Sequence, residues 1–280
     1  MSTDKRKENK MAAGYANQKE HVNPKITLVG AGPGDPDLIS VKGVRALRTA
    51  DVVIYDALVD DALLAYAPED AAKVYVGNPS GDENFSQEVV NQLMVDYAFN
   101  FGHVVRLKGG DLFVFGRGYD ELAYAARYAI ETAIVPGISS AISVPGLQGI
   151  PVTQKGVSDS LWVLTATDAT GALSPELTTA ARSRATVVIL LGFDRLEEIA
   201  AVFGREGKQD LPAAVIQNGS MKNERIAVGH VENIVTTAAD AGIDSTGPVL
   251  LVFGSAVSLG RNFRVSDGAA ASPGVAYHRE

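Results

Sequence analysis

The sequence contains no cysteine and only four histidines. The missing thiols exclude disulfide bonds, thiolate metal ligands and cysteine nucleophiles. The histidines, His21, His103, His230 and His278, are far apart in the chain and lack the spacing of paired metal ligands. We therefore predict that the protein holds no metal ion.

Two further shortages narrow the class of protein. No apolar run approaches the ~18 residues that a membrane-spanning helix needs, and no apolar segment opens the chain. Basic residues are outnumbered, with 25 Lys and Arg against 33 Asp and Glu, for a net charge of −8. A protein with this balance is poorly suited to displace counterions from nucleic acid. We expect a cytoplasmic protein that binds neither a membrane nor nucleic acid.

The order of apolar and polar segments predicts an α/β protein. Apolar runs alternate with segments of helical periodicity, and helix breakers cluster at Pro145-Gly146 and at 149–151. We place a domain boundary there. The expected parts are a disordered tail (1–24), an N-terminal α/β domain (25–150), a C-terminal α/β domain (151–264) and a flexible tail (265–280). In the second domain, Asn218-Gly219-Ser220 is typical of a hairpin turn, so its sheet is expected to be mixed.

A glycine-rich turn follows the first apolar run. Residues 26–29 predict a buried strand, and residues 30–35 then read GAGPGD. Such a turn can hold the pyrophosphate of a dinucleotide. Asp35 and Pro33 argue against an anion, because the first adds a negative charge and the second removes an N–H donor. A cofactor with a positive centre and an adenosine fits better, and a tight turn without a ligand is the alternative.

Later apolar runs also end in acidic or small residues. Asp56 closes the run 51–56, the sequence Gly109-Gly110-Asp111 follows the run 103–107, and Pro136-Gly137 follows the next run. Open α/β sheets bind ligands at the carboxyl ends of their strands. From its position alone, Asp56 is a ribose-binding acid, a catalytic acid or the cap of a helix expected over 57–66. The broken dinucleotide pattern favours catalysis.

Five blocks of sequence together resemble the tetrapyrrole methyltransferase family, which uses S-adenosylmethionine, and in particular its members that methylate uroporphyrinogen III. The resemblance covers roughly residues 25–263. The blocks are GAGPGDPDL (30–38), ADVVIYDALV (50–59), RLKGGDLFVFGRG (106–118), VPGISSAISVPGLQGIPVT (135–153) and AVIQNG (214–219).

The resemblance implies a fold, a cofactor and a reaction. The fold would be two α/β domains with the cofactor cleft between them, assembled as a homodimer. The reaction would be S-adenosylmethionine-dependent methylation of uroporphyrinogen III at C2 and C7, giving precorrin-2 for siroheme or cobalamin biosynthesis. Asp56 matches the family's proton acceptor. The residues that match its cofactor contacts are Pro33, Gly109, Gly110, Asp111, Val114, Ser139, Ser140, Leu191 and Gly219.

The expected substrate contacts are less regular. The tetrapyrrole carboxylates need cations, and the candidates are Lys42, Arg106, Lys108, Arg117 and Lys155, of which we favour Arg117. Asn78 stands where the family usually has a lysine assigned as proton donor, and an amide cannot deliver a proton. Two alternatives therefore stay open: a methyltransferase that acts on a different precorrin, and a non-catalytic protein that binds S-adenosylmethionine or a tetrapyrrole.

Overall fold

A computed structural model describes residues 22–77 and 86–263 of the chain. The chain divides into two compact units, one made of residues 1–31 and 39–137 and the other of residues 32–38 and 138–280. The division after Gly137 comes earlier than the boundary expected at 150, and the glycine-rich turn 32–38 joins the second unit. Both predicted tails lie almost wholly outside the described residues. Asn78 also lies outside them.

Unit 1 is built on a parallel sheet with strand order β3-β2-β4-β1-β5. Its strands are β1 (Lys25–Gly30), β2 (Val52–Tyr55), β3 (Ala72–Tyr75), β4 (His103–Lys108) and β5 (Glu131–Val135). Apolar side chains on both faces of β1, β2 and β4 are buried, as the near-continuous apolar runs predict for a parallel sheet. Because all five strands run the same way, their carboxyl ends share one edge, as expected.

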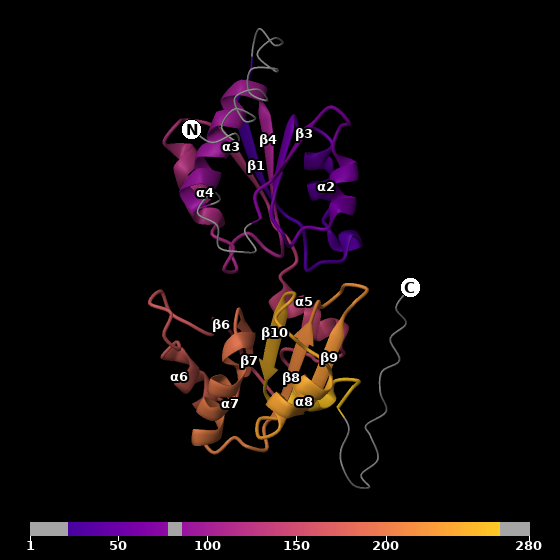
Figure 1. Ribbon diagram of the computed structural model, residues 1–280, viewed down its shortest axis with the longest axis vertical. Helices are drawn as coiled ribbons and strands as arrows, with labels where there is room; N and C mark the ends of the chain where they lie inside the picture. The colour runs from indigo at the N-terminus through magenta and orange to yellow at the C-terminus, as the bar shows by residue number, and fades with distance from the viewer. Residues whose placement is uncertain (1–21, 78–85, 264–280) are drawn as a thin grey trace, which may run out of the picture. The chain divides into compact units, whose positions relative to one another are not determined.

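Helices cover both faces of this sheet. Figure 1 shows α2 (Val41–Leu47) on one side, and α3 (Gln87–Phe101) with α4 (Gly118–Ala126) on the other. Ser40 caps α2 by accepting a hydrogen bond from Gly43 N. The helix expected over 57–66 is shorter: it is the 3-10 helix η2 (Asp61–Tyr66), and its cap is Asp60.

Unit 2 contains a mixed sheet with strand order β6-β7-β10-β8-β9. The strands are β6 (Leu161–Thr165), β7 (Thr186–Leu190), β8 (Pro212–Gln217), β9 (Arg225–His230) and β10 (Val249–Phe253). Only β6 and β7 pair in parallel, and the other three pairings are antiparallel. The turn that begins at Asn218 joins β8 to its antiparallel neighbour β9, which confirms both the predicted turn and the predicted mixed sheet.

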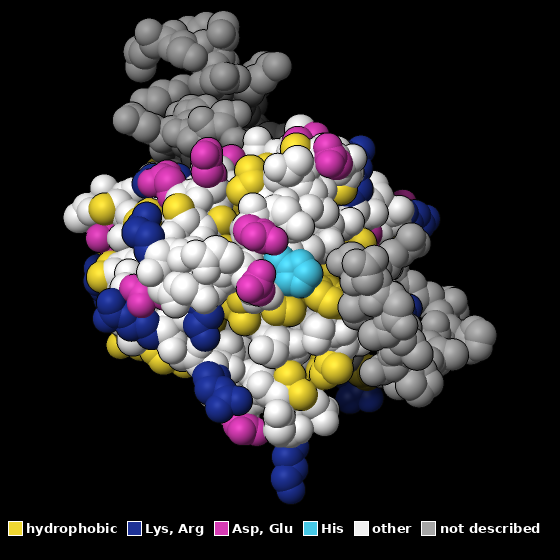
Figure 2. All heavy atoms as spheres, turned by 90° about the horizontal axis from the view of Figure 1, so that it is seen from below, with side chains coloured by type: hydrophobic (Ala, Val, Ile, Leu, Met, Phe, Trp, Pro, Cys, Tyr) yellow, Lys and Arg dark blue, Asp and Glu magenta, His cyan; other side chains and the backbone are white. Residues whose placement is uncertain are grey.

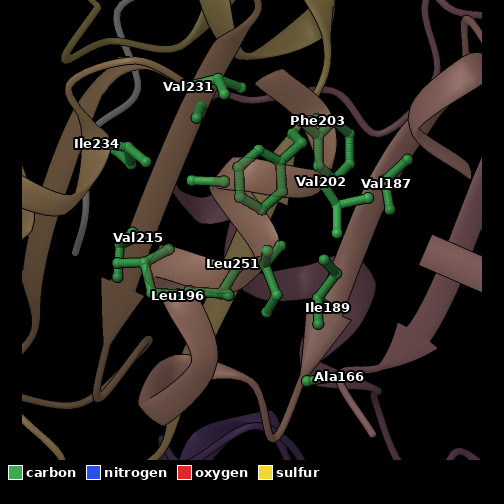
Figure 3. Close-up of a cluster of buried hydrophobic side chains, with 14 of the residues drawn as sticks. Ala166, Val187, Ile189, Leu196, Val202, Phe203, Val215, Val231, Ile234 and Leu251 are labelled. Atoms are coloured by element: carbon green, nitrogen blue, oxygen red, sulfur yellow. The ribbon is translucent and has the colours of Figure 1, made fainter. Parts of the chain in front are cut away.

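The sheet of unit 2 is also covered on both faces. One face packs against α6 (Glu176–Arg182), α7 (Leu196–Arg205) and α8 (Ile234–Asp240). In this core Phe203 stacks on Phe253 with the ring centroids 4.5 Å apart, and Figure 3 shows Phe203 above Ile189 and Leu251. The other face packs against α5 (Ser140–Leu147) and the 3-10 helix η5 (Ser255–Leu259). The buried Val144 and Pro145 of α5 explain why the chain division precedes this helix.

Within the described residues, no helix is long and apolar enough to cross a membrane. Lys and Arg side chains are interspersed with Asp and Glu on the face in Figure 2, and apolar side chains form small groups among them. This face therefore carries no extended field of one sign.

Candidate active site

The carboxyl edge of the unit 1 sheet brings three glycine turns into direct backbone contact. A Cβ added at Gly30 would lie 2.5 Å from Gly137 Cα, and one added at Gly137 would lie 2.1 Å from the carbonyl oxygen of Gly110. Asp111 accepts a hydrogen bond from Gly137 N at 3.2 Å. Only residues without side chains allow this approach. The turns that follow β1, β4 and β5 thus pack directly against one another.

Asp56 lies on the same edge, directly after β2. Its Oδ1 accepts hydrogen bonds from Leu58 N at 3.2 Å and from Gly109 N at 3.4 Å, and its Oδ2 lies 3.5 Å from Arg106 Nη2. The Asp56 side chain is 25% exposed, so the carboxylate is held by these contacts and is still accessible to solvent. Asp60 is the cap of the next helix, so the capping alternative for Asp56 is wrong. The bond to Gly109 joins Asp56 to the glycine turn that follows β4.

Three buried charged side chains lie behind Asp56. Arg106 and Lys108 project from β4, and Glu121, which is fully buried, projects from α4. Glu121 Oε1 lies 3.1 Å from Arg106 Nε and 2.9 Å from Lys108 Nζ. Burial lowers the pKa of the Lys108 ammonium, the Arg106 charge adds to this effect, and Glu121 opposes it. Arg106 and Lys108 are therefore not free cations for a substrate, and sequence reasoning missed Glu121 altogether.

In unit 2, two of the predicted cofactor turns touch each other. Asp35 N, in the turn that contains Pro33, donates to Ser220 Oγ at 3.0 Å. A Cβ at Gly34 would lie 2.8 Å from Met221 Cε, so this turn packs closely on the residues that follow Gly219. Pro33 and Gly219 are thus brought into neighbouring segments.

Gly219 also packs against the helix that Ser139 and Ser140 open. A Cβ at Gly219 would lie only 2.3 Å from Val144 Cγ1 in α5. Ser139 is the cap of α5 and accepts a hydrogen bond from Ala141 N at 3.3 Å. The small residues of these segments therefore set their spacing.

Backbone strain concentrates at these positions. Leu191, Asn218 and Ser220 have φ angles of 54°, 52° and 72°, in the left-handed region that non-glycine residues seldom adopt. Leu191 is in addition 78% exposed, although its side chain is apolar. Phe115 and Arg117 share the strained conformation in unit 1, after the Gly109 turn. Such strain is a common property of ligand-binding segments.

One carboxylate in unit 2 holds the turn after β8 in place. Glu224 Oε2 accepts a hydrogen bond from Ser220 N at 2.8 Å, and its Oε1 accepts one from Gln148 Nε2 at 2.7 Å. Gln148 follows α5 directly, so Glu224 links that helix to the strained turn. The sequence analysis did not identify Glu224, because nothing in its local pattern distinguishes it from a surface acid.

The remaining predicted residues are distributed as follows. Val114, which is 37% exposed, and Arg117 lie in unit 1 on the segment after Asp111. Arg117 pairs with Asp120 at 3.2 Å at the surface, and the structure shows no contact between Arg117 and Asp56. Described residues also line a hollow of about 380 Å³ at the opposite, amino edge of the unit 1 sheet, among them Asp51 and His103. That hollow contains none of the predicted site residues.

The described part of the chain contains no group of three or more His, Asp or Glu side chains that could hold a metal ion.

Comparisons with known proteins identify relatives of this chain. A sequence profile described as Tetrapyrrole (Corrin/Porphyrin) Methylases matches residues 25–235. A uroporphyrinogen-III C-methyltransferase of Methanocaldococcus jannaschii is 40% identical over 237 residues, which is 84% of this chain and 97% of that protein. A siroheme synthase of Neisseria meningitidis is 41% identical over 235 residues, and the match spans 48% of that longer protein.

A solved structure extends the likeness to three dimensions. The crystal structure of uroporphyrin-III C-methyl transferase from Thermus thermophilus, complexed with S-adenyl homocysteine, superposes with a TM-score of 0.70 at 34% identity. The superposition covers 84% of this chain and 99% of the other. The parallel sheet with its glycine turns, the mixed sheet and these likenesses together show that the chain belongs to the tetrapyrrole methylase family.

Proposed function

We propose that this protein transfers methyl groups from S-adenosylmethionine to C2 and C7 of uroporphyrinogen III, with precorrin-2 as the product. The observation that carries the proposal is Asp56, a partly exposed carboxylate held by Arg106 and by Gly109 N on an edge lined by glycine turns. The relatives named as uroporphyrinogen-III C-methyltransferases favour this acceptor over another precorrin. The siroheme synthases among the relatives support a place in siroheme biosynthesis, and cobalamin biosynthesis uses the same product.

The described residues fit S-adenosylmethionine. None of the predicted contact residues is basic, and Asp111 adds a negative charge, which suits a cofactor with a positive sulfur. The exposed apolar side chains of Leu191 and Val114 are available to pack on an adenosine ring. The residues that would hold the cofactor are Pro33, Gly109, Gly110, Asp111, Val114, Ser139, Ser140, Leu191 and Gly219. When bound, the cofactor supplies a methyl group that is already electrophilic, because it is attached to a sulfonium.

The protein's own contribution is to hold charge and remove a proton. In each methylation a carbon–sulfur bond breaks and a carbon–carbon bond forms at the pyrrole, leaving S-adenosylhomocysteine and a positively charged ring. Asp56 stabilises this charge and accepts the proton that the ring loses when its conjugation is restored. Gly109 N donates a hydrogen bond to Asp56 Oδ1, and Arg106 forms an ion pair with Oδ2, so both oxygens of the carboxylate are held. The proton finally passes to water.

The substrate contacts and the assembly are part of the same proposal. Arg117 is an exposed cation with a 59% exposed side chain, and it follows the glycine turn after β4, which suits a substrate carboxylate. Asn78 is proposed as a hydrogen-bonding contact in place of a proton donor. A cytoplasmic homodimer follows from the family resemblance. Light scattering on the purified protein tests the dimer.

The decisive experiment is an anaerobic incubation with uroporphyrinogen III and S-adenosylmethionine. Mass spectrometry should show a product that is heavier by two CH2 units, because each methyl group replaces a proton, and two molecules of S-adenosylhomocysteine should form for each product. Calorimetric binding of S-adenosylhomocysteine shows in parallel that the preparation is competent. Binding without any methylated product would contradict the proposal and favour a non-catalytic binding protein.

A further inference from the structure

In the buried ionic cluster behind Asp56, Glu121 and Lys108 have no part in the chemistry described so far. Glu121 lies in the first turn of α4 and is fully buried. Its Oε1 lies 3.1 Å from Arg106 Nε and 2.9 Å from Lys108 Nζ, and it accepts a hydrogen bond from Gln87 Nε2 at 3.3 Å. Groups from β4 and α3 thus converge on a single oxygen of an α4 carboxylate.

The other oxygen of the Glu121 carboxylate, Oε2, forms no hydrogen bond with the described residues, 22–77 and 86–263. This oxygen is buried. A buried charged oxygen without a partner costs stability, and apolar side chains of similar volume often replace such clusters without loss. The arrangement is therefore hard to explain by stability alone, and it points to a requirement for a charge at this place.

Arg106 connects the cluster to Asp56. Its Nε is held by Glu121, and its Nη1 donates to the carbonyl oxygens of Ile54 at 3.3 Å and Leu107 at 3.0 Å. The guanidinium is planar and rigid, so fixing Nε and Nη1 also fixes Nη2. That atom lies 3.5 Å from Asp56 Oδ2. Glu121 thus influences the position of the Asp56 carboxylate through Arg106, although the described residues show no direct contact between Glu121 and Asp56.

We propose that Glu121 is a positioning residue for methyl transfer, which acts through Arg106 to hold the Asp56 carboxylate in place. The inference rests on the proposed function, in which Asp56 accepts the proton. Lys108 completes the cluster, because its ammonium and the Arg106 guanidinium balance the two carboxylates in charge. Without Glu121, Arg106 and Lys108 would lose their shared carboxylate, and the Arg106 guanidinium would keep only its contacts with Asp56 and with the carbonyl oxygens of Ile54 and Leu107.

The test uses the full chain with Glu121→Gln, which keeps the shape of the side chain but removes its charge. We expect kcat to fall about tenfold or more, because a small displacement of a catalytic group is enough for such a loss. KM for both substrates and the calorimetric Kd of S-adenosylhomocysteine should change by less than about threefold, since Glu121 contacts neither ligand in the proposed function. Glu88→Gln on the exposed side of α3 is the matched control, with wild-type kcat expected.

A double-mutant cycle tests whether Glu121 acts through Asp56. In an Asp56→Asn background, Glu121→Gln should lower the residual rate by much less than in the wild type, because residues in one network have non-additive effects. Equal factors in both backgrounds overturn the inference. A normal rate for Asp56→Asn overturns both the inference and the proposed function at Asp56, whereas an impaired Asp56→Asn with a normal Glu121→Gln overturns the inference alone.

If Glu121→Gln does not fold, a variant with a smaller structural change can test whether Glu121 is a positioning residue. Gln87→Ala removes one donor to Glu121 Oε1 from a half-buried position and leaves all four charges in place. It should lower kcat about two- to fivefold without raising KM, because the Glu121 carboxylate gains freedom. An unchanged kcat for Gln87→Ala would then count against Glu121 as a positioning residue.

Discussion

The two units hold their site residues by different means. Unit 1 places four charged side chains, Asp56, Arg106, Lys108 and Glu121, at and behind the carboxyl edge of its sheet. Unit 2 instead places a strained turn after β8, which the Glu224 carboxylate keeps in position through hydrogen bonds from Ser220 N and Gln148 Nε2. Charge near the reacting groups changes a rate, whereas a shaped turn mainly changes an affinity. The comparison therefore predicts that changes in unit 1 lower kcat and that changes in unit 2 weaken cofactor binding.

The strongest test of this division is Asp56→Asn in unit 1. The amide keeps an oxygen that can accept from Gly109 N, but it loses the negative charge and the capacity to take a proton. We expect kcat to fall about 100-fold or more, as for the loss of a general base. Calorimetry should show S-adenosylhomocysteine bound within about threefold of the wild-type affinity.

The exposed Asp61, five residues along the chain, provides the control for this experiment. Asp61→Asn should retain the wild-type rate. If Asp56→Asn bound S-adenosylhomocysteine more weakly but kept its kcat, the prediction that changes in unit 1 act on kcat would be wrong.

The second test is Gly219→Ala in unit 2. The added Cβ would lie 2.3 Å from Val144 Cγ1, so the turn after β8 and α5 must move apart. We expect S-adenosylhomocysteine to bind about tenfold or more weakly, and the free energy of unfolding to fall by about 1–3 kcal/mol, as for other overpacked sites. The measurements are calorimetry and urea denaturation.

A compensating change makes this result specific. Val144→Ala added to Gly219→Ala removes the clashing methyl groups and should restore much of the affinity. Gly204→Ala, in α7, serves as the control because its new Cβ meets no atom within 4 Å. A loss of affinity that Val144→Ala does not relieve would show that Gly219 matters for a reason other than spacing.

The sequence predicts the elements well because short-range patterns specify them. The apolar runs that end at glycine or acid predicted β1, β2 and β4 to within about one residue. The blocks shared with the family also identified its fold and reaction class. These features depend on neighbours in the chain.

Long-range features were predicted less well. The turn 32–38 belongs to unit 2, because its contacts are with residues such as Ser220, 185 positions away in the chain. Pro145 was expected to break a helix, yet it lies inside α5, where its burial offsets the missing backbone hydrogen bond. No local rule reveals either outcome.

Glu121 shows what limits the prediction of the site itself. A charged residue on the side of α4 that also carries the buried Gly118 and Ala125 breaks the amphipathic pattern, and this was the available signal. Arg106 and Lys108 were two of the five candidate substrate cations, because a sequence does not show which charges are buried together. The pairing with Glu121 becomes visible only when α4 packs on the sheet.

A third test removes the carboxylate that supports the strained turn of unit 2. Glu224→Ala deprives Ser220 N of its acceptor and releases Gln148, so the turn should lose order without losing its residues. We expect S-adenosylhomocysteine to bind about fivefold more weakly, which corresponds to one or two hydrogen bonds, with kcat at saturation unchanged. Glu232→Ala, at an exposed position in the turn after β9, should leave both quantities unchanged. A fall in kcat at saturation would show that unit 2 contributes to the chemical step.

The smallest expected effect concerns Asp244, which supports the end of β8 from the loop before β10. Hydrogen bonds from Thr246, and then from Gln217, hold the pKa of the Asp244 carboxyl at about 2. Since the folded protein favours the ionised form, the stabilisation is complete above the ordinary pKa of the unfolded chain, about 3.9, and is lost as the pH falls through about 2. Asp244→Asn should therefore melt slightly below the wild type at pH 7, and thermal denaturation at a series of pH values should show the two melting temperatures converging between about pH 4 and pH 2. A constant difference across that range would mean that Asp244 stabilises the protein through the shape of its side chain and not through its charge.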